Sequence, residues 1–138
     1  WHQDTCLDWP TTLPPGLAIW FPLDKATSSS GTLQVIPESH KNGVIGRGHL
    51  LPKNMKKKYA PQNKILDVEI NSGDCLFFHP ALLHRSGINQ TKTSRRALNI
   101  VLIAGNSIHT GKQLSYPMLK GSEQLEPNKV LELSSVPD

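Results

Sequence analysis

The 138-residue chain has only two cysteines, Cys6 and Cys75, without the spacing of a zinc knuckle or a redox pair. A reduced intracellular chain is therefore the simplest interpretation. It has no run near the roughly 18 apolar residues of a membrane-spanning helix, so we expect no membrane span. It also lacks sustained helical periodicity and internal repeats. What remains is one domain at most, and 37% hydrophobic and 19% charged residues suit a globular one.

The first residue is Trp1 rather than methionine, and a candidate motif follows at once. We therefore interpret the chain as a partial sequence or processed fragment, in which an N-terminal targeting signal would not be visible. The C-terminal residues "SVPD" do not form a peroxisomal tripeptide. A cytoplasmic location is the default expectation, and the sequence does not indicate an oligomeric state.

The formal net charge is +4, and basic residues gather at Lys53, Lys56, Lys57 and Lys58. Such a run can mark a surface for nucleic acid or for an acidic substrate. No arginine or aromatic residue is interleaved to stack on bases, so a solvated loop is favoured and no nucleic-acid partner is expected. An anionic small-molecule substrate stays open.

The apolar segments are short, rich in β-branched and aromatic residues, and separated by Gly, Pro, Asn and Ser, which is typical of an all-β domain. Strands are predicted from this pattern at 17–23, 32–37, 64–70 and 95–105, with a very hydrophobic stretch at 75–84. A long loop with the lysines separates the second and third strands. Residues 106–138 look like an irregular tail. Short antiparallel strands of this kind form a sandwich, a barrel or a jelly roll.

The opening "WHQD" places His2 and Asp4 two residues apart, so on an extended chain both side chains project to the same face. They are candidate ligands for one metal ion, although an HxD triplet often occurs by chance. A third ligand must come from elsewhere, and the polar loops or the tail hold three of the other histidines. The two remaining candidates, His79 and His84, lie near the most hydrophobic stretch.

Arg95 follows His84 after eleven residues, and a strand, a turn and a returning strand would place the two side by side in a hairpin. Two histidines and one carboxylate leave three positions open on an octahedral ion, as in non-haem iron(II) oxygenases. A nearby guanidinium suits a carboxylate co-substrate such as 2-oxoglutarate. Taken singly, His84 is more often a core histidine and Arg95 a surface cation.

The stretches "WHQD", "SSSGTLQVIPESHKNG" and "GDCLFFHPALLHRSGINQTKTSRRAL" resemble the phytanoyl-CoA dioxygenase family of iron(II)/2-oxoglutarate oxygenases, from Trp1 to about Ala104. The resemblance implies a double-stranded β-helix, which is a cupin-like jelly roll. It places the metal ligands on His2, Asp4 and His84, and the 2-oxoglutarate arginine on Arg95. The same resemblance implies that Trp20 and Ser86 touch 2-oxoglutarate. Without it, Trp20 would be interpreted as a core aromatic residue and Ser86 as a turn residue.

Side-chain alternation supports Arg95 over its neighbour Arg96. Arg95 shares a face with Ala97 and Asn99, which are small or polar, as a cofactor cavity prefers. Arg96 shares its face with three residues that look like packing residues, namely Leu98, Ile100 and Leu102.

The implied activity is hydroxylation of a small organic substrate, coupled to oxidative decarboxylation of 2-oxoglutarate to succinate and CO2, with Fe(II), 2-oxoglutarate and O2 as requirements. Asp4 favours hydroxylation, because related halogenases replace the carboxylate with a small residue. Acyl-CoA thioesters and other small metabolites are both possible substrates. Family members usually carry an N-terminal part that this sequence lacks. The alternatives are a catalytically silent cupin-like binding domain and a zinc or manganese cupin enzyme without 2-oxoglutarate.

Overall fold

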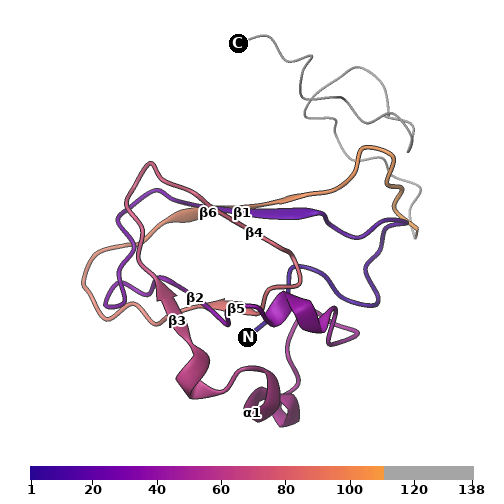
Figure 1. The fold of residues 1–138 in the computed structure, drawn as a ribbon. Coiled ribbons are helices and arrows are strands. Elements are labelled where there is room, and N and C mark those ends of the chain that lie inside the picture. Colours follow the sequence, from indigo (N-terminus) through magenta and orange to yellow (C-terminus); the bar gives the residue numbers. More distant parts are fainter. Residues whose placement is uncertain (111–138) are drawn as a thin grey trace.

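Residues 1–110, the part of the chain that the computed structural model describes, form two antiparallel sheets of three strands each (Figure 1). The first sheet has the order β4 (Leu76–Phe78), β1 (Leu17–Pro22) and β6 (Ala97–Leu102). The second has the order β3 (Leu66–Val68), β2 (Leu33–Val35) and β5 (His84–Ser86). From β3 to β6 the chain changes sheet at every connection. The predicted all-β, cupin-like class is confirmed.

The core lies between the sheets, because alternate residues of their strands point inward. Ala18 and Trp20 of β1 face Leu33 and Val35 of β2 within one buried cluster. A second cluster lies under the long loop and is built around Ile36, Ala60 and Leu83. The inner faces of both sheets therefore carry the side chains among which the site residues are set.

The predicted strands are present, although most are shorter than the apolar pattern indicated. β1 starts at the predicted residue and ends one residue early, whereas β2 and β3 each keep only three of the predicted residues. The stretch at 75–84 divides between the sheets, since β4 ends at Phe78 and β5 begins at His84. A bend at 79–83 makes this crossing possible.

The sequence pattern predicted a long loop around the lysine run, but the structure shows that this segment is not wholly irregular. It holds four short helical turns, η1 (Ser39–Asn42), η2 (Lys53–Met55), α1 (Lys56–Tyr59) and η3 (Gln62–Lys64). Each has only three or four residues, which is too short for a periodic apolar pattern to reveal. None of the described helices has the length and apolar character needed to cross a bilayer.

Two further expectations are wrong. His84 and Arg95 are not paired in a hairpin, because β5 pairs with β2 and β6 pairs with β1. Leu98 and Ile100 are not core residues either, since 53% and 38% of their surfaces are exposed. They lie on the outer face of the first sheet, where no described element covers them. Of the predicted tail, residues 106–110 include a bridge between His109 and Thr11, and residues 111–138 lie outside the described part.

Candidate functional site

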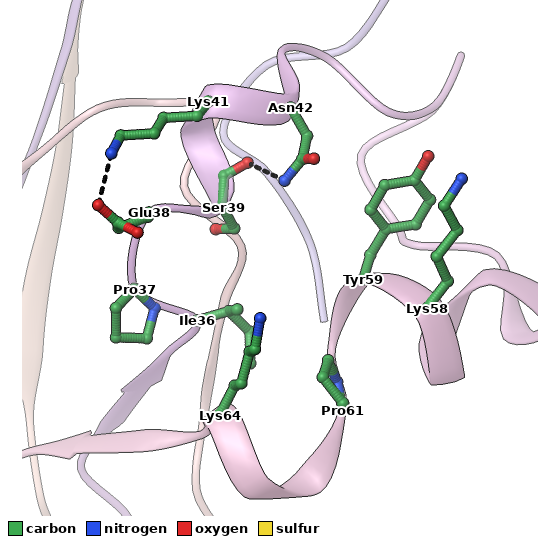
Figure 2. A pocket seen from close by; sticks show the side chains of 10 residues that line it. All are labelled: Ile36, Pro37, Glu38, Ser39, Lys41, Asn42, Lys58, Tyr59, Pro61 and Lys64. Atoms are coloured by element: carbon green, nitrogen blue, oxygen red, sulfur yellow. Dashed lines mark hydrogen bonds and ion pairs between the residues drawn. The ribbon is translucent and has the colours of Figure 1, made fainter.

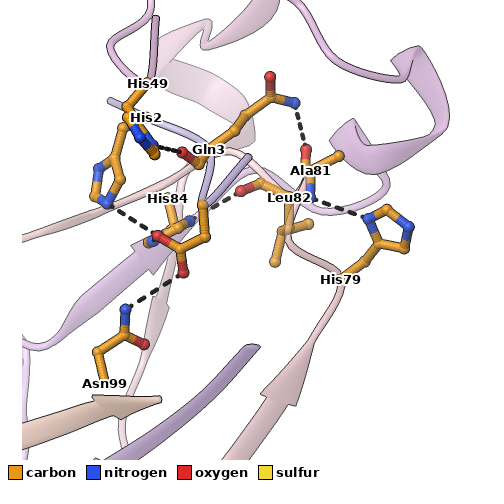
Figure 3. A network of polar contacts seen from close by, with 9 residues as sticks. His2, Gln3, His49, His79, Ala81, Leu82, His84 and Asn99 are labelled. Carbon is orange, nitrogen blue, oxygen red and sulfur yellow. Dashed lines mark hydrogen bonds and ion pairs between the residues drawn. The ribbon is translucent and has the colours of Figure 1, made fainter. Parts of the chain in front are cut away.

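His2, Asp4 and His84 meet beside β5 because the first residues of the chain pair with it. His2 and His84 exchange both backbone hydrogen bonds at 3.0 Å, and the Asp4 N–H donates to the Pro80 carbonyl at 2.8 Å. Asp4 Oδ1 lies 3.7 Å from His2 Nε2 and 3.5 Å from His84 Nε2. Figure 3 shows the two imidazoles, held by backbones far apart in sequence, turned toward the same point.

The donor atoms of these three residues fit a metal ion. One ligand atom from each lies within 4.8 Å of the others. His84 Nδ1 lies 2.9 Å from the Leu82 carbonyl, which can only accept, so Nδ1 donates to it and Nε2 is the ring nitrogen that faces Asp4. Orientation of a ligating histidine by a backbone carbonyl is a common feature of metal sites.

The charge states of His2 and Asp4 also suit a cation. Burial, followed by the nearby His84, lowers the pKa of His2 from 6.5 to about 4, so its imidazole is neutral at pH 7. Burial raises the pKa of the Asp4 carboxyl, but hydrogen bonds from His84 and Asn99 outweigh it and leave the pKa below its ordinary value. At neutral pH the two groups are a neutral imidazole and a carboxylate, the forms that bind metals.

The buried amide of Gln3 fixes the segment that carries His2 and Asp4. Its Nε2 donates to the carbonyls of Gly43 and Ala81 at 2.9 Å and 2.6 Å, and its Oε1 accepts the Ile45 N–H at 2.9 Å. Because side chains alternate along an extended chain, Gln3 points away from His2 and Asp4 and into the protein. The segment is thereby attached both to the long loop and to the bend before β5.

Arg95 and Trp20 form a second part of the site. The Arg95 guanidinium lies 5.5 Å from the centre of the Trp20 ring, and its Nη2 donates to the Gly31 carbonyl at 2.8 Å. Arg95 Nε is buried without a hydrogen-bond partner, and within residues 1–110 no carboxylate forms an ion pair with this arginine. Buried guanidinium donors are normally paired, so this arrangement fits an anionic group that completes the site.

The remaining predicted contact, Ser86, lies opposite Leu33 in the β2–β5 ladder. Side chains of directly opposite residues share a face, so Ser86 points to the same inner face as Leu33, although it is exposed to solvent. Asn99 likewise faces inward and is exposed to solvent, since it lies opposite the buried Trp20 in the β1–β6 ladder. Solvent therefore reaches the space between the sheets near both residues.

The other histidines do not join the three ligands. His79 Nδ1 accepts the Ala81 N–H at 3.0 Å, and its ring lies 5.5 Å from that of His40. His49 contacts the Gln3 carbonyl through Nδ1 at 3.2 Å and packs edge-on against Trp9. Of the two candidates that the residue pattern left open, the structure places His84 beside His2 and Asp4, and not His79.

The sequence reasoning missed two contacts of the site. Asn99 Nδ2 donates to Asp4 Oδ2 at 3.3 Å, which leaves Oδ1 facing the two histidines. Gly31 has a φ of 77° and supplies the carbonyl that holds Arg95. The inward position of Asn99 was visible in the alternation of β6, but a contact between strands and an N-terminal segment has no local signal.

Sequence comparisons give a consistent picture. A family model described as "Phytanoyl-CoA dioxygenase (PhyH)" matches residues 1–97. Phytanoyl-CoA dioxygenase 1 of Oryza sativa subsp. japonica is 32% identical over 122 residues, which cover 81% of this chain and 41% of that protein. A probable phytanoyl-CoA dioxygenase of Caenorhabditis elegans is 34% identical over 93 residues, covering 58% and 28%. The chain thus spans less than half the length of these relatives.

Among solved structures, the apo form of the non-heme monooxygenase ThoJ matches with a TM-score of 0.68 and 25% identity, over 90% of this chain and 46% of that one. The α-ketoglutarate-dependent carbocyclase SnoK from nogalamycin biosynthesis matches with a TM-score of 0.63 and 21% identity, over 82% and 46%. The second likeness concerns the fold alone. Because the matching family model covers well over half of its residues, this chain belongs to the phytanoyl-CoA dioxygenase (PhyH) family.

Proposed function

We propose that this chain carries the catalytic centre of an Fe(II)/2-oxoglutarate-dependent oxygenase that hydroxylates a small organic substrate. The observation that carries the proposal is the pairing of two arrangements on the inner faces of the sheets. One is the His2, Asp4 and His84 set, and the other is the incompletely paired Arg95 beside Trp20. Family membership and the oxygenase structural neighbours support the same general reaction.

His2, Asp4 and His84 would hold iron(II) on one face and leave the opposite face for co-substrate and O2. Iron bound there supplies the activation of O2 that is coupled to decarboxylation of 2-oxoglutarate to succinate and CO2. Arg95 would pair with the far carboxylate of 2-oxoglutarate through Nε and its remaining guanidinium donors, while Trp20 packs against the guanidinium. Ser86, which faces the same interior, would contribute a hydroxyl contact.

The carboxylate at Asp4 favours hydroxylation over halogenation, because it occupies the ligand position that a halide would need. For the substrate, the names of the curated relatives support an acyl-CoA thioester as the first class to test. That test compares the rate of 2-oxoglutarate decarboxylation with CoA thioesters and with the matching free acids. Selective stimulation by the thioesters would support this substrate class, and equal or absent stimulation would exclude it.

The proposed reaction is tested by measuring succinate formed from 2-oxoglutarate in air, with and without iron(II). We expect iron-dependent succinate from the parent chain and at least a hundredfold less from Asp4→Ala and His84→Ala. His79→Ala is a matched control, because this histidine is exposed and is not one of the three residues that could hold the metal. A folded parent that forms no succinate under these conditions would instead support a silent binding domain.

A further inference from the structure

A cavity of about 320 Å³ lies outside the metal site, between the η1 turn and the segment that joins α1 to η3. This volume is within the usual range for small-molecule pockets. Figure 2 shows η1 on one side of the cavity and Tyr59 on the other, with Lys58 beside the Tyr59 ring and Lys64 near Ile36. No ligand of the candidate metal site lines it.

The floor of this cavity is rigidly connected to the protein core. Ser39 is buried, and its hydroxyl accepts the Leu83 N–H at 2.8 Å. Ile36 donates its N–H to the Leu83 carbonyl at 2.9 Å. Leu83, which is only 1% exposed, belongs to the cluster under the long loop. The wall is therefore preformed, and residues far apart in sequence build it.

The charges around the cavity are unbalanced. Three lysines line it together with a single carboxylate, Glu38, which is hydrogen-bonded to Lys41. That bond lowers the pKa of Glu38, and the charge of Lys64 contributes in the same direction. Within the described residues, Lys58 and Lys64 form no ion pair. Two ammonium groups are thus free to bind an anion.

Apolar and aromatic surface accompanies these ammonium groups. Ile36, Pro37 and Pro61 line the cavity, and the Lys58 ammonium lies 4.8 Å from the centre of the Tyr59 ring. Glu38, at the rim, has a φ of 62°, the single positive φ of a non-glycine residue within 1–110. Such strained residues cluster at ligand sites. The lining therefore combines a positive rim with a surface suited to a planar or apolar group.

We propose that this cavity binds a small organic phosphate, with its charge attracted by the ammonium groups of Lys58 and Lys64 and the organic part against Tyr59 and Pro61. A phosphate fits better than a carboxylate because it carries more charge for two separate point charges. Bidentate recognition of a carboxylate would favour an arginine fork, which the cavity lacks. The site goes beyond the oxygenase proposal and does not depend on it.

The test is calorimetric titration of the metal-free chain with phenyl phosphate, which has an aromatic ring and one phosphate. We expect saturable one-to-one binding that weakens at least tenfold in the double variant Lys58→Gln/Lys64→Gln. The control is Lys53→Gln/Lys57→Gln, which removes the same charge from exposed lysines outside the cavity. It should bind nearly as well as the parent. Melting temperatures of all three proteins verify folding.

Two companion titrations separate the contributions. Inorganic phosphate should bind more weakly than phenyl phosphate, and phenol should not bind measurably. The proposal is overturned if the parent shows no saturable binding, if both double variants lose affinity equally, or if phenol binds as well as phenyl phosphate. Equal affinity for inorganic phosphate would overturn the part assigned to Tyr59 and Pro61. Since iron and 2-oxoglutarate are absent, none of these results bears on the oxygenase proposal.

Discussion

Asn99 illustrates how a single side chain outside the ligand set shapes the site. Its amide donates to Asp4 Oδ2, so Oδ1 alone faces His2 and His84. In the proposed site, a carboxylate held in this way would bind the metal through one oxygen, which would keep a position free for the co-substrate. In the proposed site Asn99 would therefore be a positioning residue, acting through Asp4 rather than on the metal itself.

Asn99→Ala should weaken iron(II) binding roughly tenfold, because loss of a partner that orients a ligand typically costs 10–100-fold in affinity. Anaerobic titration with iron(II) gives the dissociation constant directly. Asn99→Ser, which retains a shorter donor, should recover part of the affinity. Because Asn99 is exposed, the melting temperature of the metal-free protein should change little. Unchanged iron affinity in Asn99→Ala would contradict the assigned role.

At the scale of elements, the turn before β2 determines where Arg95 is held. A Cβ on Gly31 would lie 2.8 Å from the Asn89 nitrogen and from the Gly87 oxygen, both backbone atoms that cannot move aside easily. The φ of 77° adds a conformational cost for any other residue. Only glycine allows the connection from β5 to β6 to pass this closely and the carbonyl to reach Arg95.

Gly31→Ala should therefore destabilise the chain by about 2 kcal/mol or more, since the left-handed conformation alone costs roughly 1–2 kcal/mol. Urea unfolding measures this change. Gly73→Ala is a useful comparison, because its φ is also positive but nothing lies within 4 Å of its would-be Cβ. The difference between the two variants isolates the clash. Equal destabilisation would show that the close approach at Gly31 is unimportant.

Arg96 joins the start of β6 to the end of β1 at the surface. It donates to Asp24 through Nε, Nη2 and its backbone N–H, at 2.8–2.9 Å. Hydrogen bonding to Arg96 lowers the pKa of Asp24 from 3.8 to about 2, so the folded state favours the ionised carboxylate. The stabilisation is therefore present above pH 3.8 and is lost as the pH falls toward 2.

Thermal unfolding of the parent and Asp24→Asn across pH 2 to 7 tests this contribution. The parent should melt at a slightly higher temperature at neutral pH, and the difference should vanish near pH 2, where Asp24 becomes protonated. The effect is small because the pair is exposed. Asp74→Asn, at an exposed position without an ion pair among the described residues, is the matched charge-removal control. A difference that grows toward pH 2 would have the wrong sign.

Features of the fold and the site could be predicted from the sequence where they depend on neighbouring residues alone. The HxD pair, the inward face of Arg95 and the first strand follow from alternation over a few residues, so they could be predicted. The pairing of β5 with β2, rather than with β6, depends on contacts between distant segments. No sequence pattern around His84 predicts this pairing. The helical turns at 53–64 are too short to leave a periodic signal.

At the scale of the whole molecule, the outer face of the first sheet is unusually apolar. Ile19 of β1 lies between Phe77 of β4 and Ile100 of β6 in the ladder, and Phe21 lies opposite Leu98. Phe77 is 58% exposed and Leu98 53%. Apolar side chains that continue across all three strands form the kind of exposed patch that promotes association.

We therefore expect the purified 138-residue chain to self-associate at micromolar concentration, and Phe77→Lys/Leu98→Lys to shift it toward monomer. Sedimentation velocity over a concentration series provides the measurement. Both substitutions lie outside the proposed metal site, so iron affinity should be unchanged. Leu66→Lys, at a similarly exposed apolar position on β3 of the other sheet, is the control and should not alter association. A monomeric parent chain would contradict the expectation.

The central claim is that His2, Asp4 and His84 bind iron while Arg95 binds 2-oxoglutarate beside it. The most direct measurement is anaerobic titration with iron(II) and then 2-oxoglutarate, following the visible metal-to-ligand charge-transfer band. We predict a band in the parent, its loss in His84→Ala, and at least tenfold more 2-oxoglutarate needed in Arg95→Ala. Arg96→Ala, which removes the same charge at the surface, should titrate like the parent. A folded parent without the band, or equal effects of the two arginine variants, would contradict the account.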